Sequence, residues 1–346
     1  MTGANKILVI RFSAMGDVAM TAPVLKEFIR EYPDTELLVL SRHLFKPFFA
    51  GIPNLSFYSF EPNGKHKGFF GLVKLFIALK KLHITAVADL HNNLRSNILS
   101  SFFYLAGIKT VRLDKGRKEK SAMTRKTDKL LAPLKPMAIR YAEVFGNLGF
   151  PFLLKNGLSN PTPELLEKET YSFLPLPKVR KWIGISPFAQ HQQKVYPLQK
   201  MEQVLLALAT EGHQLFIFGG SAEEETIAAG WQMKHEHILS VVKKIPLEDE
   251  LKLISNLDLM LSMDSAGMHL ASLKNIPVVS IWGATHPYAG FLGYGQSLED
   301  TVQIDLYCRP CSVYGNVPCY RGDLACMNNL QESVVINAVL KKLSNG

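Results

Sequence analysis

Short apolar runs alternate with longer helical patterns along most of the chain, and this alternation limits the possible folds more than any other feature. The runs are almost continuously apolar, as in Lys6–Ile10, whereas a strand with one side in water would alternate apolar and polar residues. Such runs, separated by amphipathic helices, are typical of a parallel sheet covered by helices on both faces. The sequence therefore predicts a doubly wound α/β architecture.

The alternation occurs twice. In the first half the expected strands are Lys6–Ile10, Glu36–Ser41, Ser56–Phe60, Thr85–Leu90 and Lys109–Leu113, with helices at Pro23–Tyr32, Phe69–Leu82 and Leu94–Ala106. In the second half the expected strands are Trp182–Ser186, Gln214–Phe218, Leu259–Ser262 and Val278–Trp282. The helices expected there are Leu198–Thr210, Ala222–Met233, Leu247–Asn256 and Ala266–Leu273, followed by a closing helix at Leu330–Leu343.

A proline-rich segment separates the two halves. Residues 155–179 contain Pro161, Pro163, Pro175 and Pro177 among polar residues, which favours a connection between domains. At roughly 150 residues per domain, 346 residues also predict about two domains. We expect a first domain over residues 1–165, a second over 166–329 and a terminal helix over 330–346.

Net charge and hydropathy restrict where the protein works. No stretch approaches the ~20 apolar residues of a membrane-spanning helix, and Lys6–Ile10 is too short for a signal-peptide core, so we expect a cytoplasmic protein. The net charge of +9 favours an acidic partner: nucleic acid, an anionic membrane surface or a phosphorylated substrate. Residues 109–129 hold nine Lys or Arg residues and three acidic ones, which indicates either a solvated loop or a docking surface for an anionic partner.

All four cysteines lie close together near the end of the chain. They are Cys308, Cys311, Cys319 and Cys326, spaced C-x2-C-x7-C-x6-C. A disulfide framework is not expected in the cytosol. Four thiolates could close a tetrahedral zinc site, but only the first pair has the tight spacing of a zinc motif. Reduced thiols without metal are the default interpretation, and a structural zinc site is the alternative.

The loops that follow strands are where ligands bind in doubly wound folds. The first of them, Arg11–Asp17, matches neither G-x-G-x-x-G nor G-x-x-x-x-G-K-[ST], which weakens dehydrogenase and P-loop interpretations. It ends in a Gly-Asp pair before a helix. Asp17 is therefore either a helix cap or a carboxylate at the mouth of the sheet that accepts a proton.

The loops of the second half offer an anion site. Ser265 can cap a helix starting near Ala266, where free backbone N–H groups and the helix dipole favour an anion. Lys194 could supply a matching point charge. His91, His269 and His286 stand in similar loops, and each is interpreted as a structural hydrogen-bonding residue.

Five motifs in a fixed order resemble glycosyltransferase family 9, the ADP-heptose:lipopolysaccharide heptosyltransferases. They are Ile7–Pro23, Asp89–Ser96, Lys194–Pro197, Gly219–Glu224, and Asp264–Ala271 continuing to Gly283–Pro287. The resemblance implies a GT-B fold, in which two Rossmann-like domains face a cleft and the terminal helix often returns to the first domain. It also implies inverting transfer of heptose from ADP-heptose to a lipopolysaccharide inner-core or related lipid-linked acceptor, with no required cofactor or metal.

The resemblance also assigns roles to residues of this chain. Asp17 is implied as the general base. Donor contacts are implied for Ser186, Lys194, Glu223, Glu224, Asp264, Ser265, Gly267, His269 and Thr285. Acceptor contacts are implied for Ser13, Asn92, Arg95, Arg117, Lys118 and Lys120, and the basic surface also suits peripheral contact with the cytoplasmic face of the inner membrane. No nucleic-acid partner is expected.

Several positions depart from the family pattern. Ser265-Ala-Gly267 replaces the more usual Gly-Pro or Thr-Gly, Tyr196 stands where Trp is common, and Ala284–Pro287 replaces Gly-Pro-Thr-Asp-Pro. With the cysteine-rich tail, these departures resemble members from Bacteroidetes-type bacteria. Two alternatives stay open: a GT-B enzyme that uses a UDP or GDP sugar, such as an epimerase or another transferase, and a non-enzymatic basic binding protein.

Overall fold

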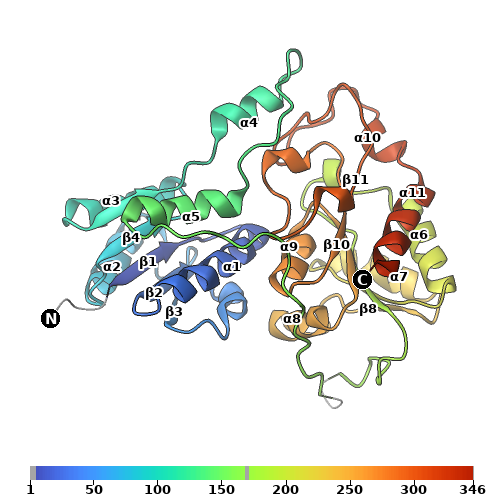
Figure 1. Cartoon of the computed structure of the whole chain (residues 1–346), viewed down its shortest axis with the longest axis horizontal. Helices are drawn as coiled ribbons and strands as arrows, with labels where there is room; N and C mark the ends of the chain where they lie inside the picture. Colours follow the sequence, from blue (N-terminus) through green and yellow to red (C-terminus); the bar gives the residue numbers. More distant parts are fainter. Residues whose placement is uncertain (1–4, 168–170, 346) are drawn as a thin grey trace. The chain divides into compact units, whose positions relative to one another are not determined.

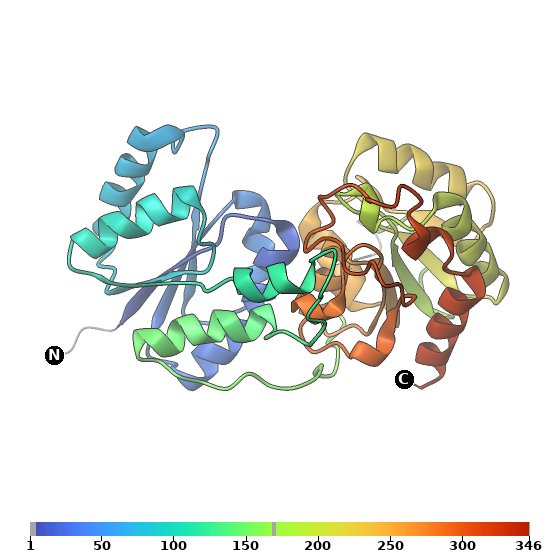
Figure 2. The same cartoon turned by 90° about the horizontal axis from the view of Figure 1, so that it is seen from above.

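The computed structural model describes residues 5–167 and 171–345, and these form two compact units. The first comprises residues 1–117 and 135–156, and the second comprises 118–134 and 157–346. Each unit is built around one parallel sheet with helices on both faces (Figures 1 and 2). The doubly wound α/β class predicted from the alternating pattern is confirmed.

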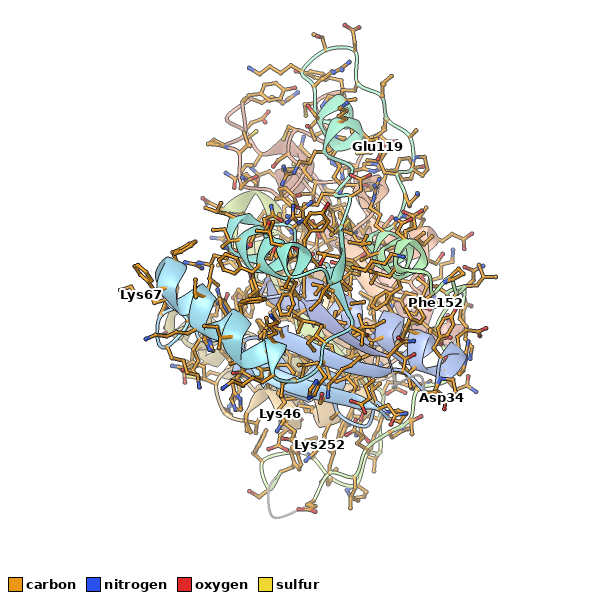
Figure 3. The ribbon with its side chains drawn as sticks, turned by 90° about the vertical axis from the view of Figure 1, so that its left-hand side faces the viewer. Asp34, Lys46, Lys67, Glu119, Phe152 and Lys252 are labelled. Atoms are coloured by element: carbon orange, nitrogen blue, oxygen red, sulfur yellow. The ribbon has the colours of Figure 1, made fainter. Side chains whose placement is uncertain are left out.

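The first sheet has the strand order β3-β2-β1-β4-β5, and all of its pairs are parallel. Its strands are β1 (Lys6–Ile10), β2 (Glu36–Ser41), β3 (Leu55–Ser59), β4 (Ala86–Asp89) and β5 (Lys109–Arg112). The helices of this region are α1 (Met15–Glu31), α2 (Gly68–Lys80), α3 (Leu94–Leu105), α4 (Arg117–Met123) and α5 (Met137–Leu148), with the 3-10 helix η1 (His43–Phe49). Helices α1 and α5 pack together, as do α2 and α3. Figure 3 views this unit from outside, with Lys67 just before α2.

The second sheet has the order β11-β10-β9-β6-β7-β8 and is also parallel. Its strands are β6 (Trp182–Ser186), β7 (Gln214–Ile217), β8 (Ile238–Ser240), β9 (Leu259–Met263), β10 (Val278–Ile281) and β11 (Thr301–Val302). Its helices are α6 (Leu198–Thr210), α7 (Ala222–Gln232), α8 (Leu247–Ser255), α9 (Ala266–Leu273), α10 (Ala325–Asn328) and α11 (Glu332–Ser344). Three short 3-10 helices are η2 (Gln192–Lys194), η3 (Pro287–Ala289) and η4 (Leu298–Asp300).

Helix α1 begins eight residues earlier than the sequence predicted. The prediction placed Pro23 at the helix start, but α1 begins at Met15 and contains Pro23 in its interior. Proline removes one backbone donor from a helix interior. Residues on both sides of it are fully buried, among them Val18 and Leu25, and this burial supports the helix through the proline. The consequence is that Asp17 lies in the first turn of α1, not in a loop.

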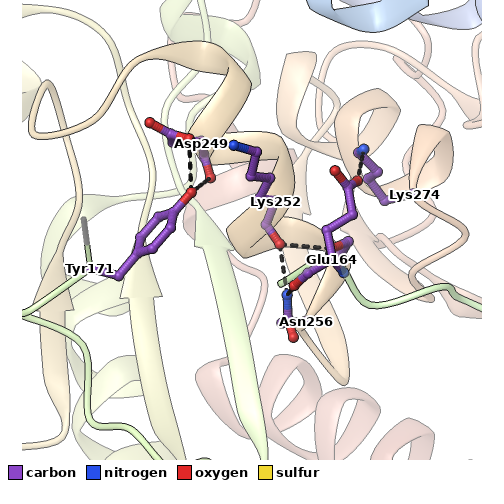
Figure 4. A network of polar contacts seen from close by, with 7 residues as sticks. Glu164, Tyr171, Asp249, Lys252, Asn256 and Lys274 are labelled. Atoms are coloured by element: carbon purple, nitrogen blue, oxygen red, sulfur yellow. Dashed lines mark hydrogen bonds and ion pairs between the residues drawn. The ribbon is translucent and has the colours of Figure 1, made fainter. Parts of the chain in front are cut away.

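The proline-rich segment does not simply join the units. Its described part is tied to the second unit, where Glu164 N donates to Ser255 Oγ at 2.9 Å and Asn256 Nδ2 donates to Glu164 O at 2.8 Å (Figure 4). Further along, Tyr171 O–H donates to Asp249 Oδ1 at 2.9 Å. Residues 168–170 of this segment, like 1–4 and 346, lie outside the described residues. The chain passes from the first unit to the second within this segment, at residues 156 and 157, and the described residues that follow are held to the second unit.

The closing helix is present as α11, and it packs within the second unit. It contacts α6, β9 and β10, and Val335 and Val339 are fully buried in the core of that unit. The return of the helix to the first unit, which the family resemblance implied, stays a prediction. No helix of the described residues is long and apolar enough to cross a membrane.

Candidate active site

Asp17 lies in the first turn of α1, directly beyond the carboxyl end of β1. Its Oδ2 is 2.5 Å from Arg11 Nη2 and accepts a hydrogen bond from Ala14 N at 3.3 Å. Arg11 is buried, and its Nη1 donates to Leu90 O at 2.6 Å. Burial opposes the charge of Arg11, but Asp17 and Tyr141 outweigh it, so that the pKa of Arg11 is raised. Both interpretations of Asp17 are therefore compatible: the carboxylate contributes to the helix start and also stands at the mouth of the sheet.

His91 holds this loop from the neighbouring strand end. Phe12 N donates to His91 Nδ1 at 3.0 Å, and Asp89 Oδ1 accepts from the backbone N–H groups of His91 and Asn92 at 2.9 and 2.8 Å. Burial, with the nearby charges of Arg11 and Lys115, lowers the pKa of His91 to about 3. The ring is thus a neutral acceptor, as expected for a structural histidine.

The residues implied as acceptor contacts differ in their surroundings. Asn92 uses its side chain to donate to Leu113 O at 2.7 Å, which links the ends of β4 and β5. Arg95 and Arg117 are exposed at the starts of α3 and α4 in the first unit, and Ser13 precedes α1. Lys118 and Lys120 belong to the second unit.

Lys118 and Lys120 are two residues apart but have opposite environments. Lys118 is exposed. Lys120 is buried, and its Nζ lies 4.1 Å from the centroid of the Phe291 ring. A cation held over a ring in this way is stabilised by the ring quadrupole. Of the two, Lys118 is therefore the one that offers its charge to solvent.

Three residues implied as donor contacts meet at the carboxyl ends of β9 and β10. Lys194 Nζ lies 2.9 Å from Asp264 Oδ2, and Thr285 Oγ1 donates to the same oxygen at 2.8 Å. Lys194 ends η2, Asp264 directly follows β9, and Thr285 follows β10. Because β6, β9 and β10 are neighbours in one parallel sheet, their carboxyl ends share an edge, and the topology brings the three side chains together.

The start of α9 is packed unusually close to the end of β6. A Cβ at Gly267 would lie 2.2 Å from Ser186 Oγ and 2.3 Å from Ser186 Cβ, so this position requires glycine. Ser265 is the N-cap residue, but its side chain makes no capping bond, and the predicted side-chain cap is wrong. Its Oγ is buried and has no hydrogen-bond partner among the described residues. His269 is buried one turn into the helix.

Of the two candidate carboxylates at the start of α7, Glu223 and Glu224, the second stabilises the turn itself. Glu224 Oε2 accepts from Gly220 N at 2.7 Å and from Ser221 N at 2.9 Å, while Ser221 Oγ accepts from Glu224 N at 3.1 Å. This is a capping box. Glu223 is exposed, so it is the carboxylate that remains available to a ligand.

Two residues near the donor site were not anticipated from the sequence. A Cβ at Gly315 would lie 2.5 Å from Lys194 Cγ, so the chain at 315 lies directly against the stem of that lysine. Arg309 is buried and donates to Thr285 O at 3.0 Å and to Gln303 Oε1 at 2.7 Å, which fixes the loop after β10. Gly315 is more than a hundred residues from Lys194, and no local sequence pattern predicts a contact between them.

The four cysteines line one small cavity, together with Arg309 and Tyr320. All four thiols are free, and burial raises the pKa of Cys311 and brings that of Cys326 to about 11. Lys129 Nζ donates to the carbonyl oxygens of Cys308 and Pro310 at 2.7 and 2.6 Å. In residues 5–167 and 171–345 no group of three or more His, Cys, Asp or Glu side chains is placed to hold a metal ion.

Comparisons with known proteins bear on the family and the fold of this chain. The family description of glycosyltransferase family 9 (heptosyltransferase) matches residues 72–318. The lipopolysaccharide core heptosyltransferase OpsX of Haemophilus influenzae is 23% identical over 292 residues, which cover 82% of this chain and 80% of that protein.

Solved structures share the fold over nearly the whole length. A family 9 glycosyltransferase from Veillonella parvula superposes with a TM-score of 0.77 at 19% identity, covering 100% of this chain and 99% of that one. The E. coli heptosyltransferase WaaC with ADP superposes with a TM-score of 0.67 at 16% identity, covering 97% and 99%.

Two Rossmann-like units in series, with polar side chains gathered at the strand ends of each, form a fold of the GT-B type. The family follows from the sequence match, which spans more than half of the chain: this protein belongs to glycosyltransferase family 9 (heptosyltransferase), as the ordered motifs predicted.

Proposed function

We propose that this enzyme transfers heptose from ADP-heptose to a lipopolysaccharide inner-core acceptor, with inversion at the anomeric carbon. The observation that carries the proposal is the anion site of the second unit: Lys194, held by Asp264, beside the start of α9 and the unpartnered Ser265 Oγ. Relatives of this protein are named as lipopolysaccharide heptosyltransferases, and a heptosyltransferase of the same fold was solved with ADP. In this proposal residues 1–165 bind the acceptor and 166–329 bind the donor.

The reaction is a single displacement. The acceptor hydroxyl oxygen bonds to the anomeric carbon, the bond from that carbon to the ADP phosphate oxygen breaks, and the hydroxyl proton moves to Asp17. An ordinary carboxylate, which titrates near pH 4, is a weak base for an alcohol. It is effective because the proton moves late, and general-base help of this kind contributes ~10²–10⁴ in rate.

The leaving ADP gains negative charge as the bond breaks. Lys194 supplies a positive charge, and the first N–H groups of α9 supply oriented dipoles toward the same edge. Ser265 Oγ offers a further donor, and exposed Glu223 offers an acceptor for a sugar or ribose hydroxyl. Thr285 and Asp264 keep Lys194 in place.

The acceptor is anionic in this proposal. Arg95, Arg117 and Lys118 meet its phosphate or acidic sugar groups, and the protein works at the cytoplasmic face of the inner membrane as a peripheral protein. A UDP- or GDP-sugar enzyme and a non-enzymatic binding protein are not favoured, because the family match is to heptosyltransferases.

Calorimetric titration with ADP, UDP and GDP at one salt concentration tests the donor, with Lys194→Ala as the matched variant. We expect selective binding of ADP that weakens in the variant. Selective binding of UDP or GDP would show that the donor is a UDP or GDP sugar and not ADP-heptose. Absence of nucleotide binding would reopen the non-enzymatic alternative. Transfer of heptose to a deacylated, water-soluble core acceptor then tests the reaction itself.

A further inference from the structure

Most of the net positive charge of this protein comes from one stretch of the first unit. Residues 62–113 contain eight Lys or Arg residues and one acidic residue, which amounts to +7 of the net +9. The single acid, Asp89, is fully buried, whereas all eight cations are exposed: Lys65, Lys67, Lys74, Lys80, Lys81, Arg95, Lys109 and Arg112. The surface of this stretch therefore presents cations and no carboxylate.

Large apolar side chains project from the same stretch. On α2, Phe69 is 56% exposed, Phe70 is 80% exposed and Ile77 is 51% exposed. On α3, Leu94 is 77% exposed and Leu105 is 80% exposed. Single exposed apolar residues are ordinary, but a cluster rimmed by charge marks an interaction surface.

The two helices form one surface. They pack against each other, and the ring of Phe69 lies 5.8 Å from that of Phe102 on α3 and 5.9 Å from that of Phe70. Leu94, Phe102 and Leu105 fall on one side of α3, because residues about three, eight or eleven apart share a helix face. We call this surface, with Phe69, Phe70, Ile77, Leu94 and Leu105, the α2–α3 face.

Lysines frame the α2–α3 face. Lys67 stands just before α2 at the outer side of the unit (Figure 3). Lys74 follows Phe70 by one helical turn, and Lys81 follows Ile77 by one turn. No carboxylate forms an ion pair with these three lysines in the part of the chain that the structure describes, in contrast to Lys65, which pairs with Glu61.

We propose that the α2–α3 face docks on an anionic lipid bilayer, with Phe70 and Leu105 entering the headgroup region and the lysines meeting lipid phosphates. This rests on the proposed function, because it supplies the surface on which a lipid-linked acceptor is held. Apolar side chains and lysines on one helical surface are the signature of interfacial binding. The excess of lysine over carboxylate on this surface gives charge complementarity, and each Lys near an anionic leaflet contributes about fivefold in affinity, ~1 kcal/mol.

A soluble polyanion such as nucleic acid would use the lysines but not the projecting Phe70 and Leu105. A second copy of this chain would bring the same +7 against itself, so self-association through this face is opposed by charge. A bilayer alone accommodates both components, since its interface offers phosphate and hydrocarbon at different depths.

Vesicle co-sedimentation of the full chain tests the docking. The vesicles contain either phosphatidylcholine alone or phosphatidylcholine with about one third phosphatidylglycerol. We expect binding to the anionic vesicles only, weakened at least tenfold by Phe70→Ser with Leu105→Ser. Lys67→Gln, Lys74→Gln and Lys81→Gln together should weaken it about a hundredfold, and salt should weaken it as well.

Matched controls remove equal hydropathy or charge elsewhere. Leu153→Ser with Met233→Ser changes two side chains that are 90% and 85% exposed, and Lys26→Gln, Lys46→Gln and Lys341→Gln remove three exposed positive charges. Both controls should bind anionic vesicles as the wild type does. The proposal would be overturned if the wild type did not bind anionic vesicles, or if the controls lost as much binding as the test variants. It would also be overturned if the protein formed dimers without vesicles and Phe70→Ser dissociated them.

The deacylated acceptor separates this proposal from the proposed function. The face variants should keep the wild-type kcat/KM on that soluble acceptor and lose rate only on acceptor embedded in vesicles. Vesicle binding without transfer to the soluble acceptor would contradict the proposed function and support the docking face. Transfer to the soluble acceptor without vesicle binding would support the proposed function and contradict the docking face.

Discussion

The two units each carry one ion pair at the mouth of a parallel sheet, and the two pairs are arranged in opposite ways. In the first unit the cation is the hidden partner: the Arg11 side chain is 6% exposed and that of Asp17 is 26% exposed. In the second unit the carboxylate is the hidden partner: Asp264 is 8% exposed and Lys194 is 16% exposed. Each hidden partner is held a second time, Arg11 by Leu90 O and Asp264 by Thr285 Oγ1.

The difference indicates what each pair presents to a ligand. A buried, anchored cation leaves a carboxylate facing outward, which suits proton acceptance from a hydroxyl. A buried, anchored carboxylate leaves an ammonium facing outward, which suits a phosphate. The same two charge types thus give opposite chemistry, according to which one is fixed in the protein.

The largest effect should come from Asp17→Asn. The amide keeps an oxygen for Ala14 N but accepts a proton far less readily, so kcat should fall ~10²–10⁴-fold. Measurement of kcat together with ADP affinity checks this, and ADP affinity should stay within about twofold because the proposed nucleotide site is built from residues of the second unit. Near-normal turnover would remove Asp17 from the mechanism.

Lys194, the more exposed member of the ion pair in the second unit, should contribute to ADP binding. Lys194→Ala should weaken ADP binding by ~1–3 kcal/mol, the range for a lost charged hydrogen bond. Lys194→Met serves as a control that keeps the aliphatic stem lying against Gly315 but not the charge, and it should weaken binding to a similar extent. ADP affinity that is unchanged in both variants would place the phosphate site elsewhere.

The approach of α9 to β6 can be tested without changing either ion pair. Gly267→Ala should push against Ser186 and lower ADP affinity and stability by ~1–3 kcal/mol, the usual cost of overpacking. Adding Ser186→Gly removes the two nearest atoms that the new Cβ would meet, so the double variant should recover most of the stability. A single variant with wild-type melting temperature would show that the contact is easily relieved.

Glu250 is a partly buried carboxylate without a paired cation among the described residues, in contrast to Asp17 and Asp264. Burial raises the pKa of Glu250 to about 7. Because the pKa in the folded state lies above the ordinary glutamate value of 4.5, the folded state loses stability as pH rises from about 4.5 to 7 and keeps a constant deficit above that. Glu250→Gln should therefore raise the melting temperature at pH 8 and have little effect at pH 4.5.

The size of the Glu250 effect should be about 1 kcal/mol, below the full linkage value, because the side chain is partly exposed. Thermal melts of both proteins at pH 4.5, 6 and 8 give the difference. A difference that does not grow with pH would show that Glu250 titrates normally.

The sheets were predictable because buried parallel strands are continuously apolar. β1, β2 and β6 have the predicted bounds, as do α6 and α9. β8 and β11 were missed because strands of three and two residues leave too short a run. α5 was not predicted, although its apolar residues recur with a helical period.

The site was predictable as a set of loops and not as a set of contacts. Asp264, Lys194 and Thr285 were each selected as donor residues, but the pairing of Lys194 with Asp264 depends on the order β10-β9-β6, which no local pattern specifies. Arg11 lies inside the first motif, but its role was not predictable, because only the folded turn brings its side chain to Asp17. These assignments of role stay predictions until the variants are measured.

The neutral histidine at the end of β4 has a consequence for how the enzyme responds to acidity. His91, with a pKa of about 3, and His286, whose pKa burial brings to about 4, both stay uncharged across the range in which a free imidazole would titrate. Neither ring can therefore act as a proton reservoir or as an acidity sensor. A bend near pH 6.5 in the logarithm of the transfer rate would therefore come from a group other than these two rings.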